Sequence, residues 1–154
     1  MTLPKPPKAL LFDLGGVLVK IDFSKALLEW VRFSRLPIGE LRSRFSFDAA
    51  YESHERGELA AEDYFAHLAQ VLELDGASRS DIERGWNSIF AGEIEETRRL
   101  VERARKSVAC FALTNTNASH MATWIDLYPA VAGSFDRVFA SHELGLRKPD
   151  PAVF

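Results

Sequence analysis

Cysteine is almost absent from this sequence of 154 residues, because Cys110 is the one example. A single cysteine cannot form an internal disulfide, and this is typical of proteins in a reducing compartment. We therefore expect a cytoplasmic protein. Cys110 lies in an apolar, strand-like run, whereas a reactive thiol needs exposure and nearby positive charge. We interpret it as a packing residue.

An excess of positive charge and a long apolar run are also lacking. Lys and Arg number 19 against 22 Asp and Glu, which gives a net charge of -3 and predicts no nucleic-acid partner. Charged residues interrupt every apolar run well short of a membrane span, so no membrane partner is expected. The first eight residues are rich in Pro and Lys, and the apolar run after them breaks at Asp13, unlike a signal peptide.

What is present begins with a short apolar run, Ala9 to Phe12, followed by Asp13 and the pair Gly15-Gly16. Such a run predicts a strand buried on both faces of a parallel sheet, although periodicity alone leaves a helix open. The two glycines predict a turn. A carboxylate at the carboxyl end of such a strand lies where α/β sheets place ligand chemistry. The alternative is that Asp13 only caps the loop.

Helical spacing of apolar residues dominates from residue 21 to about residue 90. It predicts an insertion of four or five helices with its own small core. The first expected helix is capped by Asp22 or Ser24, the second covers 38–47, and the third covers 49–56 and ends at Gly57. The fourth starts near Ala61, and the fifth starts at a capping box formed by residues 80–83.

A second α/β portion follows this insertion. We expect strands over 107–114 and 137–141, a helix over 117–128 and a loop over 143–149. Strands that alternate with helices predict a parallel, doubly wound sheet. The fold prediction is therefore a Rossmann-like α/β core (residues 1–20 and 93–154) interrupted by a helical cap (residues 21–92), with hinges near 19–22 and 90–93.

Three motifs occur in a recognisable order. They are Phe12–Leu18 (an apolar strand, Asp and two glycines), Leu113–Asn117 (a strand ending in Thr) and Arg147–Pro151 (a lysine before proline). Together they resemble the haloacid dehalogenase superfamily. The run His54–Glu58 and the Asn-Thr-Asn at 115–117 make the sequence most similar to its α-D-glucose-1-phosphate phosphatase group.

The resemblance implies a role for each motif. Asp13 would be the nucleophile that forms an aspartyl-phosphate, and Lys148 would neutralise the nucleophile and the phosphate. Thr114 would donate its hydroxyl to a phosphoryl oxygen, and the backbone N–H groups of Asn115 and Thr116 would add donors. Taken alone, Thr114 could satisfy a backbone group, and Lys148 could be a solvated loop lysine.

The resemblance also implies a metal and substrate contacts. Mg²⁺ would be held by the Asp13 carboxylate and the backbone carbonyl of Gly15, together with a later acidic motif. Arg56 and Asn117 are candidate contacts to the substrate. The alternatives are a solvated helix surface for Arg56 and a helix cap for Asn117.

The sequence departs from the family pattern at two places. Position 15 is glycine where many family phosphatases carry an acid, which favours a phosphatase acting on a small phosphorylated metabolite with an easily expelled leaving group, such as a sugar 1-phosphate. The acidic fourth motif is missing, so we expect a fragment. The alternatives are a non-catalytic module that binds phosphate or self-associates through an open sheet edge at residues 9–12, and a 2-haloacid dehalogenase.

Overall fold

The computed structural model describes residues 7–154; residues 1–6, part of the predicted core segment 1–20, lie outside them. A three-stranded parallel sheet joins β1 (Ala9–Phe12), β4 (Ala109–Thr114) and β5 (Arg137–Ala140) in the order β1-β4-β5. Because β4 is central and both neighbours run parallel to it, the carboxyl ends of all three strands meet at one edge of the sheet. The predicted α/β parallel fold is thus confirmed.

Strand β1 is an edge strand among the described residues. Its side chains alternate between exposed and half-buried, and Leu11 is 52% exposed. The prediction that residues 9–12 are buried on both faces is therefore wrong, because β1 pairs with β4 on one side only and the face that carries Leu11 is open to solvent. The expectation of an exposed apolar edge describes this strand correctly.

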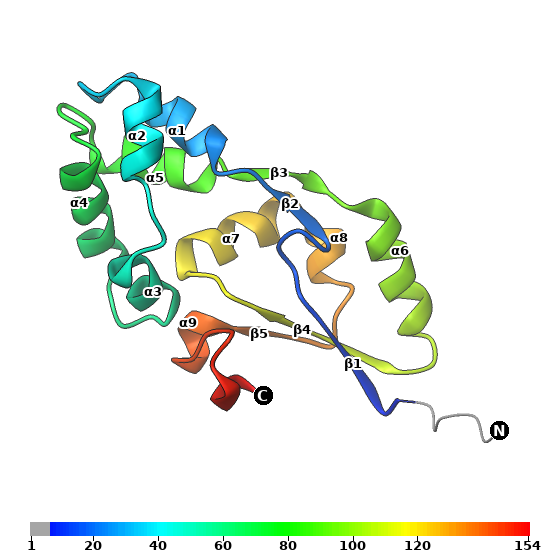
Figure 1. The fold of residues 1–154 in the computed structure, drawn as a ribbon. Coiled ribbons are helices and arrows are strands. Elements are labelled where there is room, and N and C mark those ends of the chain that lie inside the picture. Colours follow the sequence, from blue (N-terminus) through cyan, green and yellow to red (C-terminus); the bar gives the residue numbers. More distant parts are fainter. Residues whose placement is uncertain (1–6) are drawn as a thin grey trace.

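Five helices lie between the short strands β2 (Val19–Ile21) and β3 (Phe90–Glu93), which pair antiparallel at the two places predicted as hinges. Figure 1 shows these helices gathered at one end of the molecule, away from the parallel sheet. No helix among residues 7–154 is both long and apolar enough to cross a membrane. The five helices are α1 (Ser24–Trp30), α2 (Ile38–Arg44), α3 (Ala49–Glu55), α4 (Ala61–Val71) and α5 (Arg79–Asn87).

The remaining helices belong to the second half of the chain. They are α6 (Glu95–Ala104), α7 (Ala118–Leu127), α8 (Pro129–Ala132), α9 (Ser141–Leu144) and a final 3-10 turn at Pro151–Val153. Two predictions differ here: the helix expected over 117–128 ends at Leu127 with α8 following, and the loop expected over 143–149 begins inside α9. Asp150 caps the final turn by accepting from the N–H of Ala152, as an N-cap residue does.

Helix α5 begins two residues earlier than predicted. Ser78 is its N-cap, and its hydroxyl accepts from the N–H of Asp81 while the Asp81 carboxylate accepts from the N–H of Ser78. The capping box predicted at residues 80–83 is therefore misplaced, since the backbone of Ser78 is still extended and the helix starts at Arg79.

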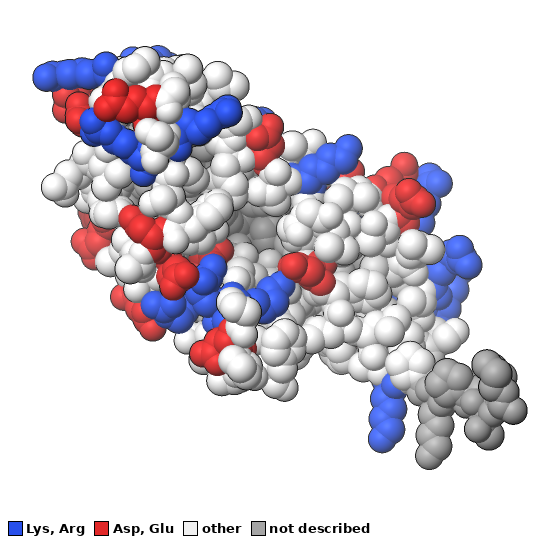
Figure 2. Space-filling model, in the orientation of Figure 1, with Lys and Arg blue, Asp and Glu red and all other residues white. Residues whose placement is uncertain are grey.

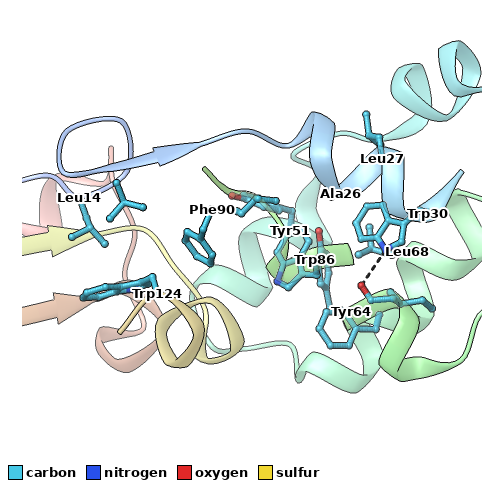
Figure 3. Packing of buried hydrophobic residues seen from close by; sticks show 14 of the residues in the cluster. Leu14, Ala26, Leu27, Trp30, Tyr51, Tyr64, Leu68, Trp86, Phe90 and Trp124 are labelled. Carbon is cyan, nitrogen blue, oxygen red and sulfur yellow. Dashed lines mark hydrogen bonds between the residues drawn. The ribbon is translucent and has the colours of Figure 1, made fainter. Parts of the chain in front are cut away.

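The buried hydrophobic residues form one continuous cluster. It contains Trp30 and Tyr64 from the inserted helices together with Val101 and Cys110 from the second half of the chain. The prediction that the insertion has its own small core is therefore wrong. Figure 3 shows the row of aromatic residues that runs from Trp30 through Trp86 and Phe90 to Trp124. The indole N–H of Trp30 donates to the backbone carbonyl of Ile82 in α5 at 3.0 Å.

Candidate active site

The three residues with predicted catalytic roles meet at the carboxyl edge of the parallel sheet. Asp13 follows β1 directly, Thr114 is the last residue of β4, and Lys148 lies in the loop after α9, which itself follows β5. These three and Gly15 line one open pocket of about 320 Å³. Figure 2 shows acidic and basic side chains close together around a hollow in this face of the molecule.

Asp13 and Lys148 form an ion pair. The Lys148 Nζ lies 2.7 Å from the Asp13 Oδ1, and the same oxygen accepts from the N–H of Leu14 at 2.7 Å. Lys148 also donates to the carbonyl of Leu113 at 2.9 Å. The ammonium is thus held between β1 and β4, and the Asp13 side chain is half exposed to solvent, where a ligand can reach it.

Thr114 is buried to 4% exposure and still lines the pocket. Its hydroxyl makes a long contact of 3.4 Å with the carbonyl of Asn115. A contact of this length is weak, so the hydroxyl is free to turn toward a ligand. This is the arrangement expected of a donor to a phosphoryl oxygen.

For Asn115 the expected donor to phosphate is the backbone N–H, whereas its side chain, for which no role is predicted, contacts Lys148. The Asn115 Oδ1 accepts from the N–H of Lys148 at 2.8 Å, and its Nδ2 donates to the carbonyl of Lys148 at 2.9 Å. The side-chain amide therefore holds the backbone of the lysine from both sides. Asn115 lines the pocket as well, but its side chain acts on Lys148.

Thr116 and Asn117 are also engaged within the protein. The N–H of Thr116, predicted to donate to phosphate, donates to the Ser141 Oγ at 2.8 Å, and Ser141 returns the bond to the Thr116 carbonyl. Asn117 is 1% exposed and is the N-cap of α7, where its Oδ1 accepts from the N–H of His120 at 3.0 Å. The structure thus favours the helix-cap alternative for Asn117.

Arg56 lies at the C-terminus of α3 and is not among the residues that line the pocket. It donates through Nε and Nη2 to the two carboxylate oxygens of Glu58, both at 2.9 Å. Arg147 occupies the pocket wall instead, together with Glu55 and Tyr51. The sequence predicts no role for Arg147, because its partners on α3 are far away along the chain and no local pattern indicates them.

A second, more enclosed pocket of about 90 Å³ adjoins the first. The two share Gly15, Thr114 and Asn115 as well as Tyr51 and Glu55. Its other walls are mostly apolar and aromatic: Leu14, Ile21, Phe23, Ile89, Phe90, Trp124, with Thr116 and His120. The volume corresponds to about three water molecules, so it admits a small group extending from the ion pair.

His120 forms part of that wall and is held neutral. Complete burial lowers the pKa of the His120 imidazole to about 3. Its Nε2 lies 3.0 Å from the Trp86 carbonyl and its Nδ1 lies 3.1 Å from the Asn117 amide nitrogen. This pattern requires a proton on Nε2 and a lone pair on Nδ1. The ring stacks on Trp86 with 4.4 Å between centroids and joins α5 to α7.

The site fits a hard cation held by few protein ligands. Within residues 7–154, no three His, Cys, Asp or Glu side chains gather into a metal-binding group. The Leu14 N–H and the Lys148 ammonium both contact the Oδ1 atom of Asp13. In the described part of the chain, the Oδ2 atom has no partner. The Asp13 carboxylate and the Gly15 backbone supply two of the three kinds of protein ligand that the resemblance implies, without the later acidic motif, and waters and substrate phosphate complete the shell of a bound Mg²⁺ elsewhere.

Known proteins resemble this chain over almost its whole length, although no family model matches it. It is 25% identical to a D-ribitol-5-phosphate phosphatase of Bacteroides thetaiotaomicron over 96% of this chain and 73% of that protein. It is 28% identical to a phosphatase of Mycobacterium tuberculosis over 95% of this chain and 69% of that protein.

Among solved structures, one match is a haloacid dehalogenase family enzyme of Bacteroides thetaiotaomicron in complex with magnesium and inorganic phosphate. The TM-score is 0.78 at 23% identity, over 95% of this chain and 74% of that one. The chain therefore shares the α/β fold of that haloacid dehalogenase family enzyme and is similar in sequence to two phosphatases. The finer resemblance to the glucose-1-phosphate phosphatase group stays a prediction, as does the expectation of a fragment.

Proposed function

We propose that this chain carries the phosphoryl-transfer site of a Mg²⁺-dependent phosphatase that acts on a small phosphorylated metabolite. The observation that carries the proposal is the 2.7 Å contact between Lys148 and Asp13 at the carboxyl edge of the parallel sheet, with Thr114 in the same pocket. The phosphatases among its sequence relatives support the same class of reaction.

The proposed chemistry needs a nucleophile and neutralising charge. An Asp13 oxygen attacks phosphorus, the bond from phosphorus to the leaving oxygen breaks, and the alcohol departs with a proton from solvent. Water then attacks phosphorus and releases phosphate from Asp13. Lys148 balances the charge of the carboxylate and the phosphoryl group, and Thr114 donates a hydrogen bond to a phosphoryl oxygen.

Mg²⁺ would bind at the Asp13 carboxylate and the Gly15 carbonyl. When bound, it supplies positive charge to the phosphoryl oxygens. Asp13 would then have two tasks, since its carboxylate would attack phosphorus and also help to hold the cation.

The leaving group would occupy the open pocket of about 320 Å³ that Gly15 and Thr114 line. Gly15 offers no side-chain acid to protonate the leaving oxygen. The missing acid supports a leaving oxygen that is expelled without much protonation, and the anomeric oxygen of a sugar 1-phosphate meets this requirement. This substrate class is the finer part of the proposal.

The test is hydrolysis of p-nitrophenyl phosphate, glucose 1-phosphate and ribitol 5-phosphate by the purified protein, with Mg²⁺ and with excess EDTA. We expect Mg²⁺-dependent phosphate release, and faster release from glucose 1-phosphate than from ribitol 5-phosphate. A faster reaction with ribitol 5-phosphate would overturn the sugar 1-phosphate assignment only. No phosphate release from any of the three, or halide release from a 2-haloacid without metal, would overturn the phosphatase itself.

A further inference from the structure

Arg147 joins the loop that carries Lys148 to a helix of the insertion. Its Nε donates to the Glu55 Oε2 at 2.9 Å, and its Nη1 donates to the Glu52 Oε1 at 2.9 Å. Both glutamates lie on α3, more than 90 positions away in the sequence. The Arg147 side chain is 19% exposed and that of Glu55 is 5% exposed. This is therefore a largely desolvated connection between the insertion and the site.

The α3 end of this connection is firmly seated. The Tyr51 hydroxyl donates to the Glu55 Oε1 at 2.8 Å, so both oxygens of the Glu55 carboxylate have partners. The N–H of Tyr51 in turn donates to Asp48, the N-cap of α3. A buried carboxylate without a positive partner is strongly destabilising. Arg147 and Glu55 thus hold each other in place.

The other end of the connection is the lysine of the active site. Arg147 and Lys148 are adjacent, so their Cα atoms are about 3.8 Å apart, and the Lys148 backbone is fixed by the Asn115 side chain. The ammonium then reaches Asp13 and the Leu113 carbonyl. The base of the lysine side chain is therefore held from two directions, by Asn115 through hydrogen bonds and by Arg147 through the chain.

We propose that Arg147 is a positioning residue: its ion pairs with Glu55 and Glu52 hold the Lys148 loop against α3, so that the lysine ammonium stays on Asp13 only while α3 is docked. The position of the inserted helices is thereby coupled to the charge that neutralises the nucleophile. The consequence for turnover rests on the proposed phosphatase function, whereas the coupling itself is a property of the fold.

The first test measures the lysine directly and needs no activity. The wild type, Arg147→Gln and Glu55→Gln are treated briefly with an amine-reactive ester, and modification of Lys148 is followed by mass spectrometry, with exposed Lys106 as the internal standard. An ammonium held on a carboxylate reacts slowly, so we expect Lys148 to be modified several-fold faster in both variants. Unchanged modification of Lys148 in both variants would overturn the proposal.

Arg98→Gln is the matched control. Arg98 is 16% exposed and also pairs with two glutamates, Glu93 and Glu102, but it lies on α6 and does not line the site. Modification of Lys148 should remain at the wild-type rate in this variant. If Arg98→Gln accelerates it as much as Arg147→Gln does, the effect is general loosening and the coupling is refuted.

The second test measures turnover. We expect Arg147→Gln to lower kcat by about 10- to 100-fold, as a small misplacement of a catalytic group does, with a smaller change in KM. The double variant Arg147→Gln/Glu55→Gln should be no worse than the more damaged single variant, because both remove one interaction. Arg147→Lys keeps the positive charge but loses the two-pronged guanidinium, and it should recover part of the lost kcat. This variant replaces Arg147→Gln in the test if Arg147→Gln does not fold. Additive losses in the double variant would contradict the coupling.

The two tests separate two kinds of failure. A chain without phosphatase activity whose Lys148 still becomes more reactive in Arg147→Gln would refute the proposed function and leave the positioning role intact. An active chain in which neither kcat nor Lys148 reactivity changes would refute the positioning role and leave the function intact.

Discussion

Asp13 is the residue on which the proposed reaction depends. Replacement of Asp13 by Asn keeps the size of the side chain but removes the nucleophilic charge and one partner of Lys148. We expect turnover of p-nitrophenyl phosphate to fall by about three orders of magnitude or more, since an amide does not displace a phosphoryl group. Steady-state kinetics, with circular dichroism to show an intact fold, provides the measurement.

Asp63→Asn is a suitable control, because this substitution removes the same charge from an exposed residue of α4. It should retain wild-type turnover. Retention of wild-type turnover by Asp13→Asn would show that another group is the nucleophile.

The residues of the site differ in how far the sequence could predict them. The roles of Asp13, Thr114 and Lys148 were predicted from the resemblance of their three motifs to a known superfamily. The structure brings these residues into one pocket because the carboxyl ends of parallel strands meet at one edge of the sheet. Of the two backbone N–H groups predicted to donate to phosphate, that of Thr116 donates to Ser141 instead, and the Asn115 side chain, for which no role was predicted, holds the Lys148 backbone. Those partners lie 25 or more positions away, and no local pattern encodes them.

At the scale of elements, the contact between α1 and α5 depends on a glycine. A Cβ built on Gly85 would overlap the indole ring of Trp30, which is fully buried. Gly to Ala normally stabilises a helix by about 1 kcal/mol, but here we expect Gly85→Ala to lower the free energy of unfolding by about 1–3 kcal/mol, as overpacking does. Urea denaturation measures this change.

Gly39 in α2 is the matched control for Gly85. A Cβ at Gly39 meets no atom within 4 Å. Gly39→Ala should therefore leave stability unchanged or raise it by up to about 1 kcal/mol. Equal effects of the two substitutions would mean that α1 and α5 do not pack as closely as the structure shows.

The contact between α5 and α7 predicts a dependence of stability on pH. Burial lowers the pKa of His120 from its usual 6.5 to about 3. Between these two values the unfolded chain takes up a proton that the folded chain excludes, so stability falls as the pH drops below about 6.5. The free energy of unfolding of the wild type should therefore decrease between pH 7 and pH 5.

His120→Gln should weaken this pH dependence, because one titrating group is removed from the unfolded state. The change in the free energy of unfolding per pH unit should become smaller by up to about 1.4 kcal/mol. His54, whose pKa is also lowered by burial, contributes a slope of the same sign in both proteins. Identical slopes in the wild type and His120→Gln would place the titration elsewhere.

Helices and strands were predictable where the spacing of their apolar residues was strongly helical or strongly strand-like. The α/β alternation and the start of α4 at Ala61 followed from spacing, whereas the ends of α2 and α7 and the capping box of α5 were shifted. The antiparallel pairing of β2 with β3 was not predicted, because strands of three and four residues carry too little pattern. The single hydrophobic cluster was missed because periodicity shows which face is apolar and not what covers it.

At the scale of the whole molecule, Mg²⁺ should bind to the folded chain and stabilise it. A ligand that binds the native state raises its stability by mass action. We expect added Mg²⁺ to raise the melting temperature of the wild type and EDTA to abolish both this shift and phosphatase activity. Asp13→Asn should show no shift, since it loses the charged ligand. A shift of equal size in Asp13→Asn would place the metal away from Asp13.

The division into a core of residues 1–20 and 93–154 and a cap of residues 21–92 stays a prediction, as does self-association through the β1 edge. Such pairing would use the backbone groups of β1 on its open side, and the exposed side chain of Leu11 would add apolar contact. Sequence reasoning can identify an apolar strand, but what covers it depends on its neighbours in space.

The continuous aromatic cluster has a consequence for how the protein unfolds. Trp86 stacks on His120 across α5 and α7, and the buried residues on both sides of this stack belong to one cluster. Neither the inserted helices nor the sheet region can expose its apolar surface without exposing that of the other. We expect a single cooperative melting transition in which the calorimetric and van't Hoff enthalpies agree. Two resolved transitions would instead show that the helices α1–α5 melt independently of the sheet.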